Sequence, residues 1–223
     1  MKTRINKFVA QATGLSRRAS DKLIEQNKVF INGQSASAGD QVNDIDKVEL
    51  DGKTLRLVTE TTLIMLNKPA GYVSSRAGQG SHTIYDLLPK ELHRLKTVGR
   101  LDKDSTGLIL LTDDGQLANN LTHPSFAKTK LYNVVLNKEL DLASTKLISE
   151  NGVSLSDGKS RLGLKALNNG KSWQVSMSEG RNRQIRRTFS SLGYEVVKLH
   201  RIQFGSYSLN DLKEGKFKVI KPI

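Results

Sequence analysis

The sequence predicts an α+β protein, whose larger part is a mixed or antiparallel sheet with helices packed on it. From residue 62 onward, short apolar runs bounded by Gly, Pro and Asp-Gly turns recur, with only a few helix-like stretches between them. In front of them, residues 1–52 have the pattern of two helices and a small hairpin. We therefore expect a small αβ domain over residues 1–58 and an α+β domain over residues 59–223.

The elements of the first domain follow from spacing and capping. Apolar residues at helical spacing over residues 5–12 predict a helix that Gly14 ends. Ser16 is a suitable N-cap for a second helix, and Asn27 stops it. A strand, an Asn-Gly turn and a second strand are predicted at residues 29–31, 32–33 and 47–50. Residues 53–62 lack an apolar period and indicate a linker or an exposed edge.

The second domain is predicted to be rich in strands. The apolar runs predict strands at residues 63–66, 108–112, 131–136, 162–167, 172–177 and 196–204. Helical spacing predicts helices at residues 84–88, 115–121, 143–151 and 181–192. Short β elements are expected at the end of the chain.

The formal net charge of +13 over 223 residues says little about fold and much about partners. Nucleic acid is the first candidate partner and an anionic membrane surface the second. The chain has no apolar run long enough to span a bilayer and no signal-peptide pattern, so we expect a cytoplasmic protein that does not bind membranes. It has no cysteine, and its four histidines lack ligand spacing, so we expect no metal and no disulfide.

Basic residues gather early in the chain. Arg17 and Arg18 fall in the first turn of the second helix, where the helix dipole disfavours positive charge. A cost of this kind suggests a use such as gripping phosphates, although a solvated basic helix face is the alternative. The strings Arg4-Ile-Asn-Lys-Phe8, Ser16-Arg-Arg18 and Val29-Phe-Ile-Asn-Gly33 resemble the small RNA-binding module of ribosomal protein S4. The resemblance implies RNA contacts by the following residues: Arg4, Lys7, Arg17, Arg18 and Lys22.

One carboxylate stands out in the second domain. Asp102 follows Arg100 in a glycine-bounded loop, and an apolar strand begins directly after this loop. This arrangement holds a charged side chain rigidly at a sheet edge, although a loop aspartate that caps a turn is the alternative. We treat its neighbour Asp104 as structural.

The string Gly99-Arg-Leu-Asp-Lys-Asp-Ser-Thr-Gly107, with the strand behind it, resembles the catalytic motif of the ribosomal RNA pseudouridine synthases of the small-subunit type. The resemblance implies that Asp102 is catalytic and that no cofactor is needed. The family's reaction breaks the N1–C1′ bond of uridine and forms a C5–C1′ bond. The aspartate either attacks C1′ or stabilises a sugar cation and takes the C2′ proton, and the sequence leaves both routes open.

A second string, Glu179-Gly-Arg-Asn-Arg-Gln-Ile-Arg-Arg187, resembles the family motif whose basic residue pairs with the aspartate. By position this residue is Arg186, and a bidentate pair would orient the carboxylate. The same reasoning implies RNA contacts by the remaining basic residues of the motifs, and a solvated helix face is the alternative. These RNA-contacting candidates are Lys68, Arg100, Arg181, Arg183 and Arg187.

Two apolar positions complete the predicted site. Tyr132, in the pattern Lys130-Leu-Tyr132, matches a family tyrosine that stacks on the uracil, as a flipped base requires. Leu199 matches a leucine that lines the uracil pocket. Each could instead be an ordinary core residue.

Together these motifs predict a monomeric enzyme that isomerises one uridine of ribosomal RNA, free or in a ribosomal subunit assembly intermediate. Large-subunit RNA is slightly favoured over small-subunit RNA. A non-catalytic RNA-binding assembly factor is the alternative from another class. A glycosidase that releases the base would need a second carboxylate, which the motifs do not offer.

Overall fold

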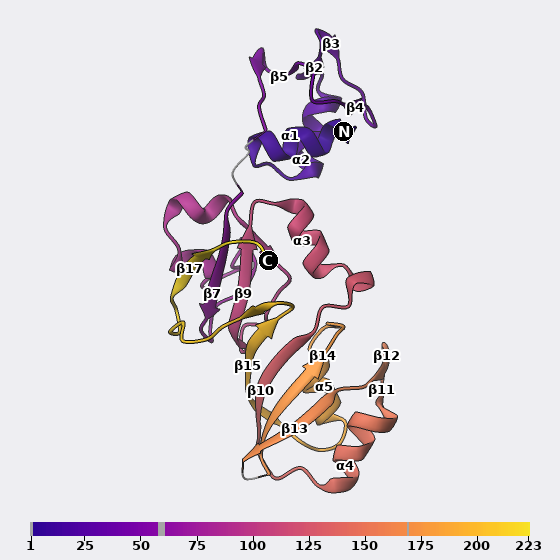
Figure 1. Ribbon diagram of the computed structural model, residues 1–223, viewed down its shortest axis with the longest axis vertical. Coiled ribbons are helices and arrows are strands. Elements are labelled where there is room, and N and C mark those ends of the chain that lie inside the picture. The colour runs from indigo at the N-terminus through magenta and orange to yellow at the C-terminus, as the bar shows by residue number, and fades with distance from the viewer. Residues whose placement is uncertain (1, 58–60, 169) are drawn as a thin grey trace. The chain divides into compact units, whose positions relative to one another are not determined.

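The computed structural model describes residues 2–57, 61–168 and 170–223, and Figure 1 shows its elements coloured along the chain. The chain divides into two compact units. These are Met1–Thr62 with Asp113–Gly115, and Leu63–Thr112 with Gln116–Ile223. The predicted domain boundary between residues 58 and 59 lies outside the described residues. Within the described ranges, no helix has both the length and the apolar character needed to cross a bilayer.

In the first unit, both predicted helix junctions are confirmed. Helix α1 (Ile5–Thr13) ends at Gly14, which takes the left-handed conformation with φ 76°. Helix α2 (Arg17–Glu25) begins after Ser16, whose hydroxyl accepts a hydrogen bond from the Ala19 amide.

The strands of this unit form two small sheets. Their bounds are β1 (Thr3–Arg4), β2 (Val29–Ile31), β3 (Gln34–Ser35), β4 (Gln41–Val42), β5 (Val48–Leu50) and β6 (Lys53–Thr54). One sheet pairs β1 with β4, and the other has the order β3-β2-β5-β6. Residues 53–54 therefore form an exposed edge strand, one of the two expectations for that stretch.

The second unit is built on a nine-stranded mixed sheet, which confirms the predicted class. Its main order is β13-β14-β10-β15-β9-β7-β17, with β16 on β15 and β8 on β9. The neighbours are antiparallel except β9 and β15, which run parallel. The bounds are β7 (Leu63–Lys68), β8 (Lys96–Val98), β9 (Thr106–Thr112), β10 (Lys130–Leu136), β13 (Gly163–Asn168), β14 (Ser172–Met177), β15 (Val196–Phe204), β16 (Tyr207–Ser208) and β17 (Phe217–Ile220).

Strands β7 and β9 are buried on both faces of this sheet. Ile64 and Ile109 pack into one hydrophobic core, whereas Leu63 and Leu108 pack into the other. A strand covered on both sides needs apolar residues at consecutive positions, which accounts for the uninterrupted runs in the sequence.

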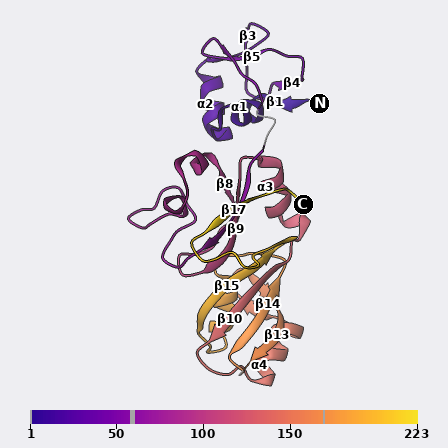
Figure 2. The ribbon, with the colours of Figure 1, turned by 60° about the vertical axis from the view of Figure 1, so that its left-hand side comes forward.

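The helices of this unit differ from prediction at their ends. Their bounds are α3 (Gly115–Thr122), α4 (Leu142–Lys146), α5 (Gln184–Ser190), the 3₁₀ helices η1 (Ile84–Leu87), η2 (Lys90–Arg94) and η3 (Pro124–Phe126), and the π-helix η4 (Leu147–Asn151). The helix predicted from residue 181 begins only at Gln184, because Arg183 is left-handed with φ 46°. Figure 1 shows α4 and α5 near β13 and β14, and Figure 2 shows α4 at the same end of the unit.

One hairpin was not predicted. Strands β11 (Val153–Leu155) and β12 (Gly158–Ser160) pair antiparallel around a turn at Ser156 and Asp157. The Asp157-Gly158 dipeptide is a signal for such a turn, so the sequence contained the information.

Candidate active site

A cavity of about 550 Å³ opens between two loops of the second unit. We call residues 99–105, which join β8 to β9, the aspartate loop. We call residues 178–183, which join β14 to α5, the arginine loop. Side chains of β10 and β15 also line the cavity, namely Lys130, Tyr132, Leu199, Arg201 and Phe204. Asp102, Tyr132 and Leu199, selected from the sequence, thus lie around one cavity.

Asp102 is half-buried, with 35% of its side chain exposed. Its Oδ2 atom lies 3.8 Å from Nη1 of Arg183, and the same nitrogen lies 3.8 Å from Oδ2 of Asp104. The Ser105 amide donates to the Asp102 carbonyl over 3.1 Å, which closes the loop as a turn. A single guanidinium is therefore shared by two carboxylates at the cavity.

The prediction that Arg186 pairs with Asp102 is wrong in this structure. Nη1 of Arg186 donates to the Val196 carbonyl (2.6 Å) and Nη2 to the Asp104 carbonyl (3.2 Å). Within the part of the chain that the structure describes, Arg186 makes no ion pair with Asp102, and burial lowers the pKa of its guanidinium. Because α5 begins three residues later than predicted, Arg183 reaches the carboxylate and Arg186 braces the backbone.

Arg183 occupies a strained position. Its φ of 46° and ψ of 30° lie in the left-handed region, which costs a residue with a side chain about 1–2 kcal/mol. Strain of this kind persists where the surroundings enforce it, and it concentrates at functional sites. The strained backbone directs the guanidinium toward both acidic side chains.

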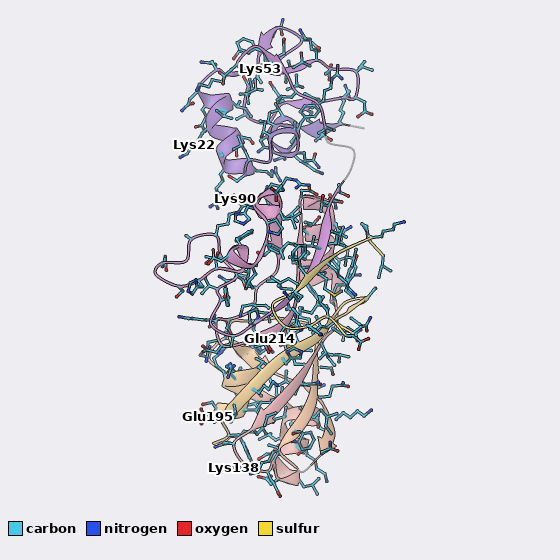
Figure 3. The ribbon with its side chains drawn as sticks, turned by 90° about the vertical axis from the view of Figure 1, so that its left-hand side faces the viewer. Lys22, Lys53, Lys90, Lys138, Glu195 and Glu214 are labelled. Carbon is cyan, nitrogen blue, oxygen red and sulfur yellow. The ribbon has the colours of Figure 1, made fainter. Side chains whose placement is uncertain are left out.

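The buried side chain of Lys68 supports the aspartate loop. It is completely buried, and its Nζ atom donates to the carbonyls of Pro69 (3.0 Å), Lys103 (3.3 Å) and Ser105 (2.7 Å). Burial lowers its pKa to about 8, while the charges of Asp102, Asp104 and Glu214 act in the opposite direction. Glu214 is labelled in Figure 3.

The predicted RNA contact by Lys68 is therefore wrong, because the amine has no access to a ligand. Its partners Lys103 and Ser105 lie 35 and 37 residues further along the chain. A lysine at the end of a strand is usually solvated, and only the folded loop turns this one into a brace.

Lys130 supports the arginine loop in the same way. This half-buried amine donates to the carbonyls of Lys128 (3.3 Å), Ser178 (3.1 Å) and Glu179 (3.3 Å). Burial lowers its pKa. No role was predicted for Lys130, although it lies two residues before Tyr132 on the same face of β10.

Asp157 clamps the arginine loop from outside. Its carboxylate accepts two hydrogen bonds from Arg187, at 3.0 and 2.6 Å, and one from Arg181 at 3.0 Å. Arg181 also donates to the carbonyls of Gly158 and Lys159. The hydrogen bonds from Arg187 hold the pKa of Asp157 below its ordinary value.

The β11–β12 hairpin engages the guanidiniums of both Arg181 and Arg187, and their predicted contacts with RNA stay a prediction. Because that hairpin was not predicted, the partners it offers to the two arginines were not expected. Arg183 and Arg100 remain the exposed arginines at the cavity.

Two buried side chains of strand β15, Leu199 and Arg201, line the cavity together with Tyr132. Tyr132 is cross-strand neighbour of Arg201 in the sheet, and Leu199 pairs with Val134. Arg201 is only 2% exposed and lines the cavity, but the sequence analysis did not select it. The sequence feature that could have identified Arg201 is a charged residue at an inward-facing position of an apolar strand, two residues after Leu199.

The RNA-binding candidates of the first unit lie on its surface. Arg4, Arg17, Arg18 and Lys22 are exposed, Lys7 is half-buried, and Lys22 is labelled on α2 in Figure 3. Arg17 donates to the Asn6 side chain over 3.2 Å, so part of its donor capacity is used within the unit. Their contacts with RNA stay a prediction.

Comparison with known proteins matches both units. Residues 62–191 match the family model described as RNA pseudouridylate synthase, and residues 3–48 match the S4 domain. A ribosomal small subunit pseudouridine synthase A from Pasteurella multocida is 36% identical over 96% of this chain and 94% of its own. A ribosomal large subunit pseudouridine synthase B from Bacillus subtilis is 33% identical over 98% and 92%. A crystal structure of a pseudouridylate synthase aligns with a TM-score of 0.71 and 34% identity, over 98% of this chain and 96% of that one.

Proposed function

The chain belongs to the RNA pseudouridine synthase family, and on that premise we propose that it converts a uridine of ribosomal RNA to pseudouridine with Asp102 as catalytic residue. The S4 domain supports docking on RNA, and the names of the relatives point to ribosomal RNA. These relatives are named for both subunits, so the preference for large-subunit RNA stays a prediction.

The reaction is an isomerisation and consumes no co-reactant. The N1–C1′ bond breaks, the base turns over and C5 bonds to C1′, while C5 loses a proton and N1 gains one. Asp102 either attacks C1′ as a nucleophile or stabilises the sugar cation and takes the C2′ proton. Arg183 orients its carboxylate, and Tyr132 offers an aromatic surface to the flipped base.

One observation carries this proposal: Asp102, Tyr132 and Leu199 line a single cavity, with Arg183 at 3.8 Å from the carboxylate. Residues far apart in the sequence converge there as a base-flipping isomerase requires. The cavity of about 550 Å³ also falls in the range of small-molecule sites, so a flipped nucleotide is a reasonable occupant.

The test is pseudouridine mapping across all ribosomal RNA from cells that lack the protein, complemented with wild type, Asp102→Asn or Asp104→Asn. We expect one site to vanish in the deletion, return with wild type and stay absent with Asp102→Asn, a loss on the order of 10⁴-fold or more in rate. Asp104→Asn removes the other carboxylate that shares Arg183 and is expected to keep the product.

The alternatives give different results. An unchanged map would contradict the enzyme proposal and favour a non-catalytic assembly factor. Release of free uracil by the purified protein would indicate a glycosidase. We further propose that the protein acts as a cytoplasmic monomer, which cell fractionation and analytical ultracentrifugation test.

A further inference from the structure

Arg201 is a buried arginine whose hydrogen-bonding capacity is mostly unused. Its Nε atom donates to the Leu108 carbonyl over 2.7 Å, and this is its one hydrogen bond within the described residues. The Nη2 atom is buried without an acceptor, although the side chain lines the cavity and is 2% exposed. A buried donor left unpaired costs about 1–3 kcal/mol, and more when it is charged.

The two lysines that support the loops of the cavity lack this deficit. Lys68 and Lys130 each donate to three backbone carbonyls, which equals the number of donors on an ammonium group. The positive charge of Arg201 also lowers the pKa of both lysines. The fold thus pairs both lysines that brace loops, whereas Nη2 of Arg201, like Nε of Arg181 and Arg186, is buried without an acceptor. Among these three arginines, Arg201 is the one whose whole side chain is buried.

The position of Arg201 is tightly fixed. A Cβ atom at Gly107 would lie 2.3 Å from the Arg201 carbonyl oxygen, so β9 and β15 approach too closely for any side chain there. The guanidinium carbon lies 5.0 Å from the centre of the Phe204 ring, within the range of a cation–π contact. The close strand pairing fixes the Arg201 backbone, and the Leu108 hydrogen bond and the Phe204 ring hold its guanidinium before any ligand arrives.

We propose that Arg201 donates hydrogen bonds to a carbonyl oxygen of the flipped uracil and stabilises the negative charge that forms on the detached base. This inference rests on the proposed function. When N1–C1′ breaks, the bonding electron pair stays on the base and spreads from N1 to O2 and O4, and Arg201 keeps its protons throughout. A fixed cation at such an oxygen stabilises the transition state more than the ground state.

A base oxygen fits the observations better than a phosphate oxygen. Arg201 is Tyr132's cross-strand neighbour and stands two residues from Leu199, and both of these residues are expected to contact the base. With 2% of its surface exposed, Arg201 can be reached only by a group that enters the cavity. RNA phosphates stay on the outside, where the exposed Arg100 and Arg183 lie.

The experiment compares wild type, Arg201→Met, Arg201→Lys and the control Arg161→Met in single-turnover reactions on an RNA fragment that contains the mapped uridine. Arg161 is exposed and lies outside the cavity lining. We expect Arg201→Met to lower the rate on the order of 10²–10³-fold with little change in RNA Kd. Arg201→Lys keeps the charge without the guanidinium geometry and is expected to recover part of the rate.

Substrates with sulfur in place of O2 or O4 test the contact itself, because sulfur is a weaker acceptor. We expect one of these substitutions to slow wild type about tenfold or more and to have a smaller effect on Arg201→Lys, as for coupled partners. This readout does not depend on the folding of Arg201→Met.

Two results would overturn the inference while leaving the proposed function intact. One is the absence of coupling: either neither sulfur substitution changes the wild-type rate, or the rate loss from sulfur is the same in wild type and in the Arg201 variants. The other is a weaker Kd with an unchanged rate and a reduced salt dependence, which would indicate a phosphate contact. Failure of wild type to form pseudouridine on any ribosomal RNA would overturn both proposals.

Discussion

Each of the two loops that line the cavity is held by a lysine that donates to backbone carbonyls, and the two lysines differ in how deeply they are buried. Beneath the aspartate loop, the amine of the completely buried Lys68 donates to three carbonyls. Beneath the arginine loop, the half-buried Lys130 does the same, and the exposed Asp157 adds ion pairs from outside. The loop that carries Asp102 is thus fixed by contacts that solvent cannot reach, whereas salt can weaken those of the arginine loop.

Replacing each lysine in turn tests whether the more deeply buried one contributes more to stability and rate. We expect Lys68→Met to destabilise the protein by about 2–4 kcal/mol, because buried carbonyls lose their donor. Single-turnover rate should fall on the order of 10²-fold, because Asp102 is no longer held in its reactive geometry. Lys130→Met, the matched change, should cost about tenfold in rate and about 1 kcal/mol. Urea unfolding and rapid-quench assays measure both.

Lys218→Met serves as control, since Lys218 is exposed on β17 next to β7. It should change neither quantity appreciably. Equal losses for the two cavity lysines would contradict the difference in depth described here.

A second test uses pH. The pKa of Lys68 is lowered from 10.5 to about 8, so between these values the folded chain holds a neutral amine while the unfolded chain binds a proton. Stability therefore rises with pH in this window for wild type relative to Lys68→Met. Activity moves in the opposite direction, because the neutral amine has lost a donor and the positive charge near Asp102. Parallel stability curves, or a rate that stays flat from about pH 7 to 9.5, would contradict this.

The smallest effect is expected for Asp157, whose ion pairs with Arg181 and Arg187 we call the outer clamp. Asp157→Asn should lower single-turnover rate about two- to fivefold at low salt, because Arg181 and Arg187 lose a shared partner. The gap should close toward about 0.5 M salt, where screening weakens the wild-type clamp as well. The pKa of Asp157 is below its ordinary 3.8, so the clamp stays charged throughout the assay range. Asp211→Asn, at another exposed carboxylate, controls for net charge; a gap that persists at high salt would show that the ion pairs are not responsible.

Local signals predicted the elements well and their long-range partners poorly. Gly14 and Ser16 mark helix ends because a left-handed glycine and a capping hydroxyl act within one turn. The left-handed Arg183 could not be read in this way, because the surrounding fold enforces a conformation that its side chain disfavours. That one residue moved the start of α5 and changed the arginine that meets Asp102.

The site itself was predictable as far as motif resemblance reached. Asp102, Tyr132 and Leu199 were selected and lie at one cavity. Lys68 and Arg201 were misjudged or missed, because burial of a charged side chain depends on carbonyls and strands distant in the sequence.

The parallel pairing of β9 with β15 has a consequence for how the protein folds during its synthesis. It joins residues 94 positions apart, and forming a contact this distant in the chain first requires the entropy cost of closing a long loop. Asp102 leaves the ribosome early, but Leu199 and Arg201 reach it only after nearly all of the described chain has been synthesised. A nascent chain therefore carries Asp102 without the rest of the cavity lining until translation has passed β15.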